Sequence, residues 1–413
     1  MAVTPERPTT TSPASTVDSA PGWITVGAAF VSMAVVFGVA YSFGAFFAPM
    51  AAEFGAGSGA TSIVFSFTAF CWFLLGSVSG RAVDRFGPRP VLLVGAVALA
   101  AGLIATSWVT QLWMGYLTYG LGVGIAVACG YVPMVAVVGG WFDRRRGIAL
   151  AVAVAGIGVG TLAGAPLAAV LIDAYGWRRT NVIFAVAGAA LLLGCALVAR
   201  RPPEAEGAAP LPLRSVVRTR AFRSLYVSTL LASLALFVPF VFLPTFAVEA
   251  GVPPVLAATL VGVIGVASVL GRLAIGGLAD RIGRIRTYQI SFAILAVSFV
   301  AWLFTSSATA ETALPLLLVF TVVLGIGYGG WIALQPTVVA ELFGLRGLGG
   351  LVGLIYTAGG IGALIGPPLA GLVIDATGGY RWSIAGAMVC ATGAFLALLP
   401  LSRGDFTRSG GRC

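Results

Sequence analysis

A single arginine, Arg272, lies inside a long apolar stretch of the sequence, away from the ends of that stretch. Asp280 follows it at a distance of about 12 Å along a helix. If this stretch crosses a membrane, a cation at that depth costs about 2.5–3.5 kcal/mol even on a lenient insertion scale, and something must offset the cost. A guanidinium can hold a carboxylate through two parallel hydrogen bonds. Arg272 is therefore our first candidate for a site that binds an organic acid.

Small and polar residues share the expected helical face of Arg272. Ser268 lies one turn before it and Gly276 one turn after it, and Gly265 extends the same stripe. Such a face leaves room beside the guanidinium for a carboxylate and water, and we expect the Ser268 hydroxyl to contribute to the site. Two alternatives remain open: Arg272 could snorkel toward the lipid headgroups, or it could pair with a backbone carbonyl as a structural contact.

Four tyrosines lie within other apolar stretches, where their hydroxyls could hydrogen-bond a carboxylate or a hydroxyl group. These further candidates for substrate binding are Tyr41, Tyr119, Tyr328 and Tyr356. Tyrosine also packs well with its ring in an apolar environment and its hydroxyl in water, and this alternative applies to each of the four. Gln335 and Asn181 are polar candidates of the same kind.

The composition of the chain shows what surrounds these residues. Hydrophobic residues make up 59% of the 413 positions, the mean hydropathy is +1.02, and only 9% of the residues are charged. Because a membrane-spanning helix needs about 20 apolar residues, the chain has room for about a dozen such helices and little else. We predict an all-α polytopic membrane protein. Its twelve expected helices cover residues 23–49, 60–80, 90–109, 112–141, 147–173, 179–199, 223–248, 254–278, 287–307, 311–341, 347–374 and 382–401.

A polar segment divides the expected helices into two groups of six. It runs from Arg200 to Arg223 and contains Arg-Arg-Pro-Pro-Glu-Ala-Glu-Gly near its start. The chain begins with a stretch rich in Thr, Ser and Pro that lacks the basic start and short apolar run of a signal peptide, and we expect it to be disordered. The predicted organisation is an N-terminal tail (1–21), a first six-helix bundle (22–199), a central linker (200–222), a second six-helix bundle (223–401) and a C-terminal tail (402–413).

Two sequence patterns occur once in each half of the chain. The residues Gly80, Asp84, Arg85 and Gly87 return 196 positions later as Gly276, Asp280, Arg281 and Gly283. Gly160, Gly164 and Pro166 of the fifth expected helix return 202 positions later in the eleventh. Glycines at such spacing let helices approach closely, and proline lets a helix bend. Duplicated halves in a polytopic membrane chain indicate a transporter, because two pseudo-symmetric halves can rock about a central site.

Arginines are concentrated on one side of the predicted topology. The sequence contains no lysine, so every cationic side chain is an arginine. Besides the linker and tail arginines, the loops on this side contain Arg81, Arg85, Arg89, Arg144, Arg145, Arg146, Arg281, Arg284, Arg286 and Arg346. The positive-inside rule places these loops, the linker and both termini in the cytoplasm. We expect a multi-pass protein of a bacterial-type cytoplasmic membrane.

The repeated Gly-x-x-x-Asp-Arg-x-Gly loops resemble the hallmark of the major facilitator superfamily, and the resemblance extends over essentially the whole chain after the N-terminal tail. The run from Trp141 to Gly156, Trp-Phe-Asp-Arg-Arg-Arg-Gly-Ile-Ala-Leu-Ala-Val-Ala-Val-Ala-Gly, resembles the fifth-helix signature of the monocarboxylate transporter family. Ala151 and Ile157 replace a glycine and a serine that are usual in that signature. The resemblance implies a fold of twelve transmembrane helices in two pseudo-symmetric bundles.

The same resemblance implies a role for Arg272, which falls at the position of the family's eighth-helix arginine, a residue that binds the substrate carboxylate. Two departures change the chemistry around it. Ser268 stands where many relatives have an acidic residue, and Tyr41 stands where they have a first-helix lysine. Bacterial relatives include oxalate/formate exchangers, so the substrate does not follow from the family alone.

The repeated loop motifs suggest a latch on the cytoplasmic side. Ion pairs among their aspartates and nearby arginines would hold the inner gate shut, stabilise the outward-open state and break when the halves rock. The predicted latch consists of Gly80, Asp84, Arg85, Gly276, Asp280, Arg281, Arg144, Arg145 and Glu341. The alternative is that these charges only set the topology, which accounts for the arginines but not for the repeated aspartates.

These observations favour a secondary transporter of small monocarboxylates such as lactate or pyruvate. Moving a bare monoanion inward costs about 2.3 kcal/mol per 100 mV, so uptake needs a proton alongside or an anion in exchange. Arginine does not deprotonate, and no other titratable acid or base lies near mid-membrane. We favour proton symport, with the substrate carboxylate carrying the proton. The alternatives are organic anion exchange of the oxalate/formate type and export of drugs or other lipophilic compounds.

Other function classes fit the sequence poorly. The chain has no histidine, no cysteine pair at metal-binding spacing and no nucleophile–base pair, so we expect no enzyme. The absence of a P-loop argues against an ATP-driven pump. We expect no cofactor, no metal and no nucleic-acid partner. The expected partners are a small organic anion, protons and membrane lipid, and the expected functional unit is a monomer.

Overall fold

The computed structural model describes residues 19–202, 216–305, 310–344 and 348–402, and the elements in these ranges are helical. Most of the two predicted tails and of the linker lies outside the described residues. The first half contains α1 (Ala20–Tyr41), α2 (Phe43–Phe54), α3 (Ser58–Phe86), α4 (Pro88–Ser107), α5 (Leu112–Gly130), α6 (Val132–Trp141) and α7 (Arg146–Val198). The second half contains α9 (Arg220–Glu249), α10 (Pro254–Ile282), α11 (Arg284–Thr305), α12 (Ala310–Phe343), α13 (Leu348–Thr377) and α14 (Arg381–Leu398), followed by a short 3-10 turn (Leu399–Ser402).

Within the described ranges, eleven helical segments are long and apolar enough to cross a membrane. One of them, α7, is 53 residues long and therefore long enough for two crossings. Its backbone leaves the helical region at Gly176, where φ is 77° and ψ is 159°, a conformation that favours glycine. Counting α7 as two crossings gives the twelve predicted from the sequence. The predicted division at residues 173–179 falls at this glycine.

Two crossings are broken near their middle. The first consists of α1 and α2, which meet at Ser42, whose hydroxyl donates to the Val39 carbonyl at 2.7 Å. The fourth consists of α5 and α6, which meet at Tyr131. Pro133 follows this break, and proline fits the first turn of a helix because it has no N–H to donate. Tyr131 is therefore the residue that joins α5 to α6 at this break.

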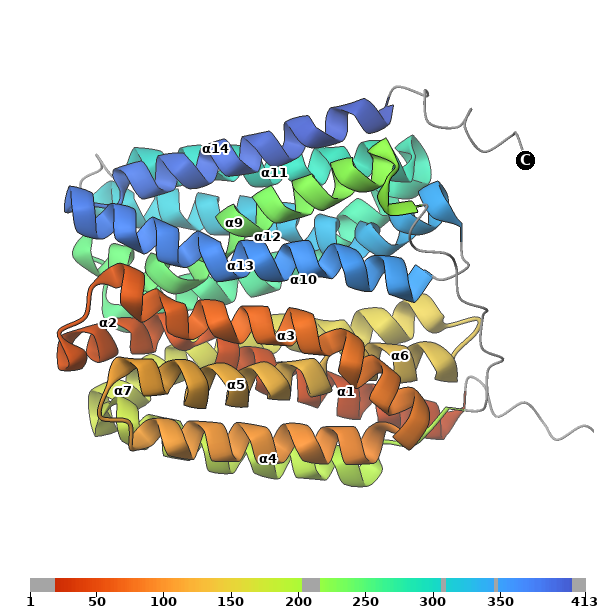
Figure 1. Ribbon diagram of the computed structural model, residues 1–413, viewed down its shortest axis with the longest axis horizontal. Coiled ribbons are helices and arrows are strands. Elements are labelled where there is room, and N and C mark those ends of the chain that lie inside the picture. The colour runs from red at the N-terminus through yellow and green to blue at the C-terminus, as the bar shows by residue number, and fades with distance from the viewer. Residues whose placement is uncertain (1–18, 203–215, 306–309, 345–347, 403–413) are drawn as a thin grey trace, which may run out of the picture.

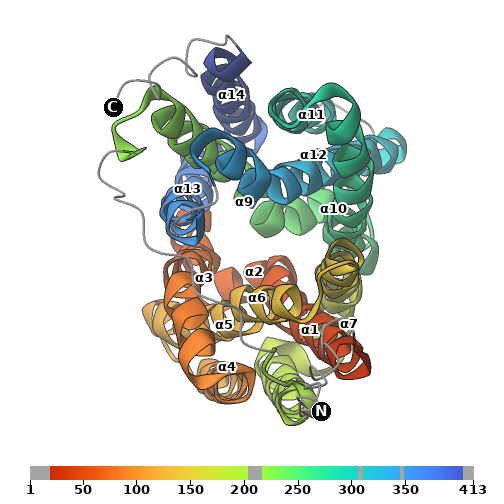
Figure 2. The same ribbon diagram turned by 90° about the vertical axis from the view of Figure 1, so that its right-hand side faces the viewer.

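The helices form two bundles that follow the two halves of the sequence. Seen from the end that carries the arginine-rich loops, α1–α7 form one group and α9–α14 the other (Figure 2). Figure 1 shows the same division from the side, with α9–α14 in the upper half of the picture and α1–α7 in the lower half. The main contacts between the groups are made by α3 with α13 and by α7 with α10.

The repeated glycines lie where helices touch within each bundle. A Cβ on Gly160 or Gly164 of α7 would meet the backbone of α1, at Ala34 and Gly38. In the second half, Gly366 makes the same kind of contact between α13 and α9. Only a hydrogen on the α-carbon leaves space for such close backbone approach. The sequence prediction of close helix packing at these glycines is confirmed.

On the side opposite the arginine-rich loops, a carboxylate joins the two bundles. Asp375 at the end of α13 accepts hydrogen bonds from the backbone N–H groups of Ser58 (2.8 Å) and Gly59 (2.9 Å). These amides begin α3, where the free N–H groups and the helix dipole favour a negative charge. Gly371 packs directly on Gly59, so the two helices meet backbone to backbone. We call this contact the Asp375 clasp.

Candidate functional site

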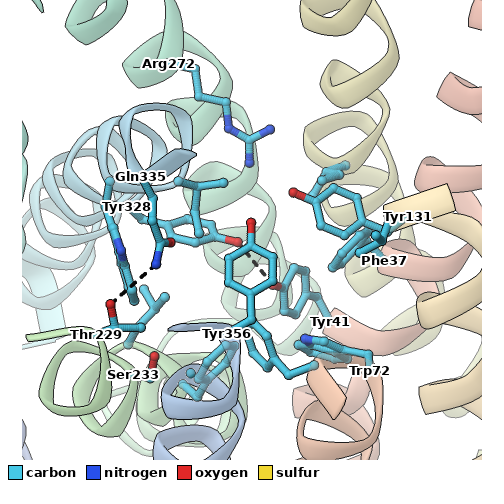
Figure 3. Close-up of a pocket in the computed structure, with 18 residues that line it drawn as sticks. Phe37, Tyr41, Trp72, Tyr131, Thr229, Ser233, Arg272, Tyr328, Gln335 and Tyr356 are labelled. Carbon is cyan, nitrogen blue, oxygen red and sulfur yellow. Dashed lines mark hydrogen bonds between the residues drawn. The ribbon is translucent and has the colours of Figure 1, made fainter. Parts of the chain in front are cut away.

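The guanidinium of Arg272 points into a cavity between the two bundles (Figure 3). Its Nε, Nη1 and Nη2 atoms are all buried, and none has a hydrogen-bond partner among the described residues. Two alternatives were given for Arg272, snorkelling toward the lipid headgroups and pairing with a backbone carbonyl. Both are wrong in this arrangement, because the guanidinium is buried in the cavity and no described carbonyl accepts from it. Buried polar groups are nearly always hydrogen-bonded, so three unpartnered donors on one cation are unusual.

The cavity is enclosed mainly by aromatic and apolar side chains. It has a volume of about 50 Å³, and a cavity needs only roughly 10–15 Å³ to hold a water molecule. Among the described lining residues, Arg272 is the one with a formal charge. The lining residues are Phe37, Tyr41, Trp72, Phe73, Tyr131, Val132, Ile157, Thr229, Ser233, Leu236, Phe237, Arg272, Tyr328, Trp331, Ile332, Gln335, Tyr356 and Gly359.

The two bundles contribute different chemistry to this lining. The α1–α7 bundle supplies mostly hydrocarbon and aromatic surface, and its hydrogen-bonding side chains in the lining are Tyr41, Tyr131 and Trp72. The α9–α14 bundle supplies Arg272 and most of the neutral hydrogen-bonding groups. A molecule with a charged end and an apolar body would thus place its polar contacts mainly on the second bundle.

A pair of tyrosines links the bundles beside the cavity. The hydroxyl oxygens of Tyr41 (α1) and Tyr328 (α12) lie 3.3 Å apart, within hydrogen-bond distance. The Tyr41 ring also stacks on Phe240 of α9, with centroids 4.2 Å apart. Tyr41 therefore connects the bundles by a polar and an aromatic contact at once.

Three of the four predicted tyrosines line the cavity: Tyr41, Tyr328 and Tyr356. Tyr119 does not. It is buried within the first bundle, where its hydroxyl donates to the Val39 carbonyl at 3.1 Å. Tyr119 is therefore a packing residue, the alternative considered for each of the four tyrosines.

The small residues that precede Arg272 on its helix pack against neighbouring helices, which differs from the role inferred from the sequence. Ser268 is buried, its hydroxyl donates to the Gly265 carbonyl at 2.7 Å, and its backbone packs on Gly329 of α12. Gly265 packs on Gly158 of α7. The interpretation that this stripe leaves room beside the guanidinium is wrong for these two positions, because neighbouring helices fill the space. The room comes from side chains on other helices.

Sequence reasoning missed several lining residues. Tyr131 lies at the α5–α6 break, and the proline that follows it was the available signal. Thr229, Ser233 and Trp331 lie among long apolar runs, where nothing in the local sequence separates a cavity-facing residue from a packing residue. The spacing of four between Thr229 and Ser233 was a weak signal, because it puts both on one helical face.

The residues of the predicted latch lie on the arginine-rich side, where their side chains are mostly exposed. Among the described residues, no ion pair joins Asp84, Arg85, Asp280 or Arg281 to another side chain. The Arg201 guanidinium donates instead to the backbone carbonyls of Asp84 and Arg85. Glu341 is also exposed at the end of α12. The ion pairs predicted for the four loop-motif charges are therefore not formed in this arrangement, in which the opposite side holds the Asp375 clasp.

Two further polar contacts on the opposite side stay within single bundles. Glu53 accepts from Arg178 at 2.6 Å and from the Trp177 indole at 2.5 Å, which ties the end of α2 to α7. Tyr380 donates to Glu249 at 2.9 Å in the second bundle. Burial and the neighbouring Glu249 carboxylate raise the pKa of Tyr380. These contacts brace each bundle but do not join the two.

Comparison with known proteins agrees with this architecture. The model of the Major Facilitator Superfamily matches residues 28–313 and 278–411. The chain belongs to this superfamily. It is 32% identical to monocarboxylate transporter 3 of Rattus norvegicus over 397 residues, covering 91% of this chain and 79% of the relative. It is also 32% identical to monocarboxylate transporter 13 of Bos taurus over 388 residues, covering 92% and 89%.

A solved structure supports the fold independently. A bacterial homolog of the human lysosomal transporter Spinster, in an inward-facing and unoccupied conformation, superposes with a TM-score of 0.72 at 16% identity, covering 94% of this chain and 98% of that chain. Together with the long apolar helices, these comparisons describe a multi-pass membrane transporter of the monocarboxylate transporter type, not an enzyme.

Proposed function

We propose that this chain carries small monocarboxylates, such as lactate or pyruvate, across the cytoplasmic membrane by alternating access. The observation that carries the proposal is the buried and unpartnered guanidinium of Arg272 in the central cavity. A carboxylate there would satisfy two of its donors in one bidentate contact and offset the cost of the buried charge. The small cavity suits a molecule of few heavy atoms. The relatives named monocarboxylate transporters support the same substrate class.

The contacts between the bundles support an inward-facing arrangement. The Asp375 clasp and the Tyr41–Tyr328 pair hold the bundles together on one side and near the centre. On the arginine-rich side, which we assign to the cytoplasm, Asp84, Arg85, Asp280 and Arg281 form no ion pair with one another. We infer that the latch ion pairs form when the bundles rock to the outward-facing state, at the expense of the clasp.

We infer that proton symport balances the charge of the substrate. None of the described lining residues is a carboxylate or a histidine, so the cavity offers no conventional proton carrier. A monocarboxylate released from Arg272 could itself take up a proton and leave as the neutral acid. The alternative, exchange against an internal anion, satisfies the membrane potential equally well.

The test is uptake of radiolabelled lactate into proteoliposomes. Arg272→Ala should reduce uptake to the level of empty liposomes, because a neutral cavity no longer compensates the carboxylate. Arg286→Ala removes an exposed arginine on the arginine-rich side and should leave uptake near that of the wild type. Full uptake by Arg272→Ala would show that this arginine does not bind the substrate.

The same vesicles distinguish the coupling modes. Symport predicts uptake driven by an inward proton gradient into vesicles that contain no anion substrate. Exchange predicts uptake only into vesicles preloaded with a carboxylate, whatever the proton gradient. Uptake that needs preloading would replace symport by exchange and leave the role of Arg272 intact.

A further inference from the structure

A second group of polar side chains lines the same cavity, away from Arg272. Thr229 and Ser233 lie four residues apart on α9, and Trp331 and Gln335 lie four residues apart on α12, so each pair occupies one helical face. All four side chains are deeply buried: the exposed fraction is 1% or less for Thr229, Ser233 and Gln335, and 3% for Trp331. We call these four residues the neutral cluster.

The neutral cluster has hydrogen-bonding capacity that the protein does not use. The Gln335 amide donates to the Thr229 hydroxyl at 3.4 Å, which is long for a hydrogen bond. The Ser233 hydroxyl has no hydrogen-bond partner among the described residues. A buried hydroxyl is rarely left in this state, and on the wall of a cavity, beside the weakly bonded Gln335 amide, it indicates a place for a polar group of a ligand.

The neutral cluster and Arg272 lie at different ends of the cavity. Figure 3 shows the guanidinium at one end and Thr229 and Ser233 at the other, with the rings of Tyr328 and Tyr356 between them. A carboxylate held by Arg272 would leave the far end of the same molecule facing α9 and α12. The cluster would therefore meet a distal atom of the substrate and not the carbon next to the carboxylate.

We propose that the neutral cluster is a second subsite, which binds an uncharged oxygen-bearing group distal to the substrate carboxylate. The Ser233 hydroxyl can donate or accept, which fits a hydroxyl or a carbonyl. A second carboxylate would be buried beside neutral donors without a counter-charge, and an ammonium would find no acceptor with charge. This inference rests on the proposed function, because Arg272 must orient the acid.

The probes are butanoate and its 2-, 3- and 4-hydroxy derivatives, titrated calorimetrically into the purified full-length protein. The 3- or 4-hydroxy acid should bind about 3- to 10-fold more tightly than butanoate, the usual value of one net hydrogen bond. The 2-hydroxy acid should show less of this gain, because its hydroxyl lies beside the carboxylate.

Ser233→Ala should abolish the preference for the distal hydroxyl while butanoate binds as before. Ser228→Ala is the matched control on α9, because the Ser228 hydroxyl already donates to the Leu225 carbonyl at 3.0 Å and does not line the cavity. Loss of an unpartnered hydroxyl should not lower the melting temperature, so thermal unfolding of Ser233→Ala checks that the variant is folded.

The outcomes separate this inference from the proposed function. If the acids bind through Arg272 but no distal hydroxyl improves affinity, or if the gain survives Ser233→Ala, the second subsite is refuted and the carboxylate site stands. If none of the four acids binds, both proposals fail. A distal-hydroxyl preference that is lost in Ser233→Ala and kept in Ser228→Ala supports the subsite.

Discussion

At the scale of single residues, the central feature is that the buried cation is an arginine. Guanidinium offers a planar fork of donors, whereas the ammonium of lysine is a compact point charge on a flexible stem. The fork matches the two oxygens of a carboxylate, and the surrounding tyrosine hydroxyls can complete the contacts from the sides.

The planar arrangement of donors on the Arg272 guanidinium leads to a prediction for Arg272→Lys. The variant keeps the charge but loses the bidentate geometry, so we expect lactate to bind about 10-fold more weakly than in the wild type. Competition with unlabelled lactate in the uptake assay measures this change. Wild-type affinity in Arg272→Lys would mean that charge alone holds the substrate.

Tyr119 provides a contrasting prediction at the same scale. Its hydroxyl donates to the Val39 carbonyl inside the first bundle and does not reach the cavity. Tyr119→Phe should lower the free energy of unfolding by about 1 kcal/mol, the usual net value of a buried hydrogen bond, without changing the KM for lactate. Thermal unfolding and transport kinetics on the same preparation check both parts. A raised KM with normal stability would place Tyr119 in the binding site.

At the scale of helices, glycine positions decide how closely the elements pack. Gly160 of α7 touches the backbone of α1, whereas Gly194 near the end of the same helix has open space around it. Gly160→Ala should cost about 1–3 kcal/mol, because the added methyl overlaps the Ala34 carbonyl. Gly194→Ala should be neutral or slightly stabilising, as expected for alanine in a helix. Equal melting temperatures for the two variants would contradict the packing account.

The helices show what the sequence can and cannot predict. Hydropathy and the repeated motifs were enough for twelve crossings and two halves, because every spanning helix needs about 20 apolar residues. The division of α7 at Gly176 was visible as a polar break. By contrast, Ser268 and Tyr119 lie on spanning helices as expected but face neighbouring helices. In an apolar bundle the pattern of polar residues does not distinguish the helix faces that meet lipid, another helix or the cavity. The sequence therefore could not predict which face of each helix points into the cavity.

At the scale of the whole molecule, the two bundles use duplicated residues differently. Asp375 clasps the first turn of α3. Asp173 of α7 precedes it by 202 positions, the same offset as the repeated glycines, but is exposed and has no hydrogen-bond partner among the described residues. The pseudo-symmetry of the sequence is therefore broken in this arrangement. Both aspartates lie on the side opposite the arginine-rich loops, so the asymmetry is between the two bundles and not between the two sides.

The clasp predicts a specific effect of Asp375→Asn. Removing the charge weakens both hydrogen bonds to the α3 amides, so the bundles should separate more often on that side. Hydrogen–deuterium exchange of the Ser58 and Gly59 amides should become faster. Asp173→Asn is the control and should leave exchange at these amides unchanged. Equal exchange in wild type and Asp375→Asn would show that the clasp does not hold the closed side.

The most direct test of the account is equilibrium binding of radiolabelled lactate to the purified protein, because binding does not depend on gating or coupling. The account predicts saturable binding to the wild type and a loss of affinity of at least about 30-fold in Arg272→Gln, corresponding to about 2 kcal/mol for a buried charge contact. Binding to Arg272→Gln with wild-type affinity would contradict the claim that this guanidinium receives the carboxylate.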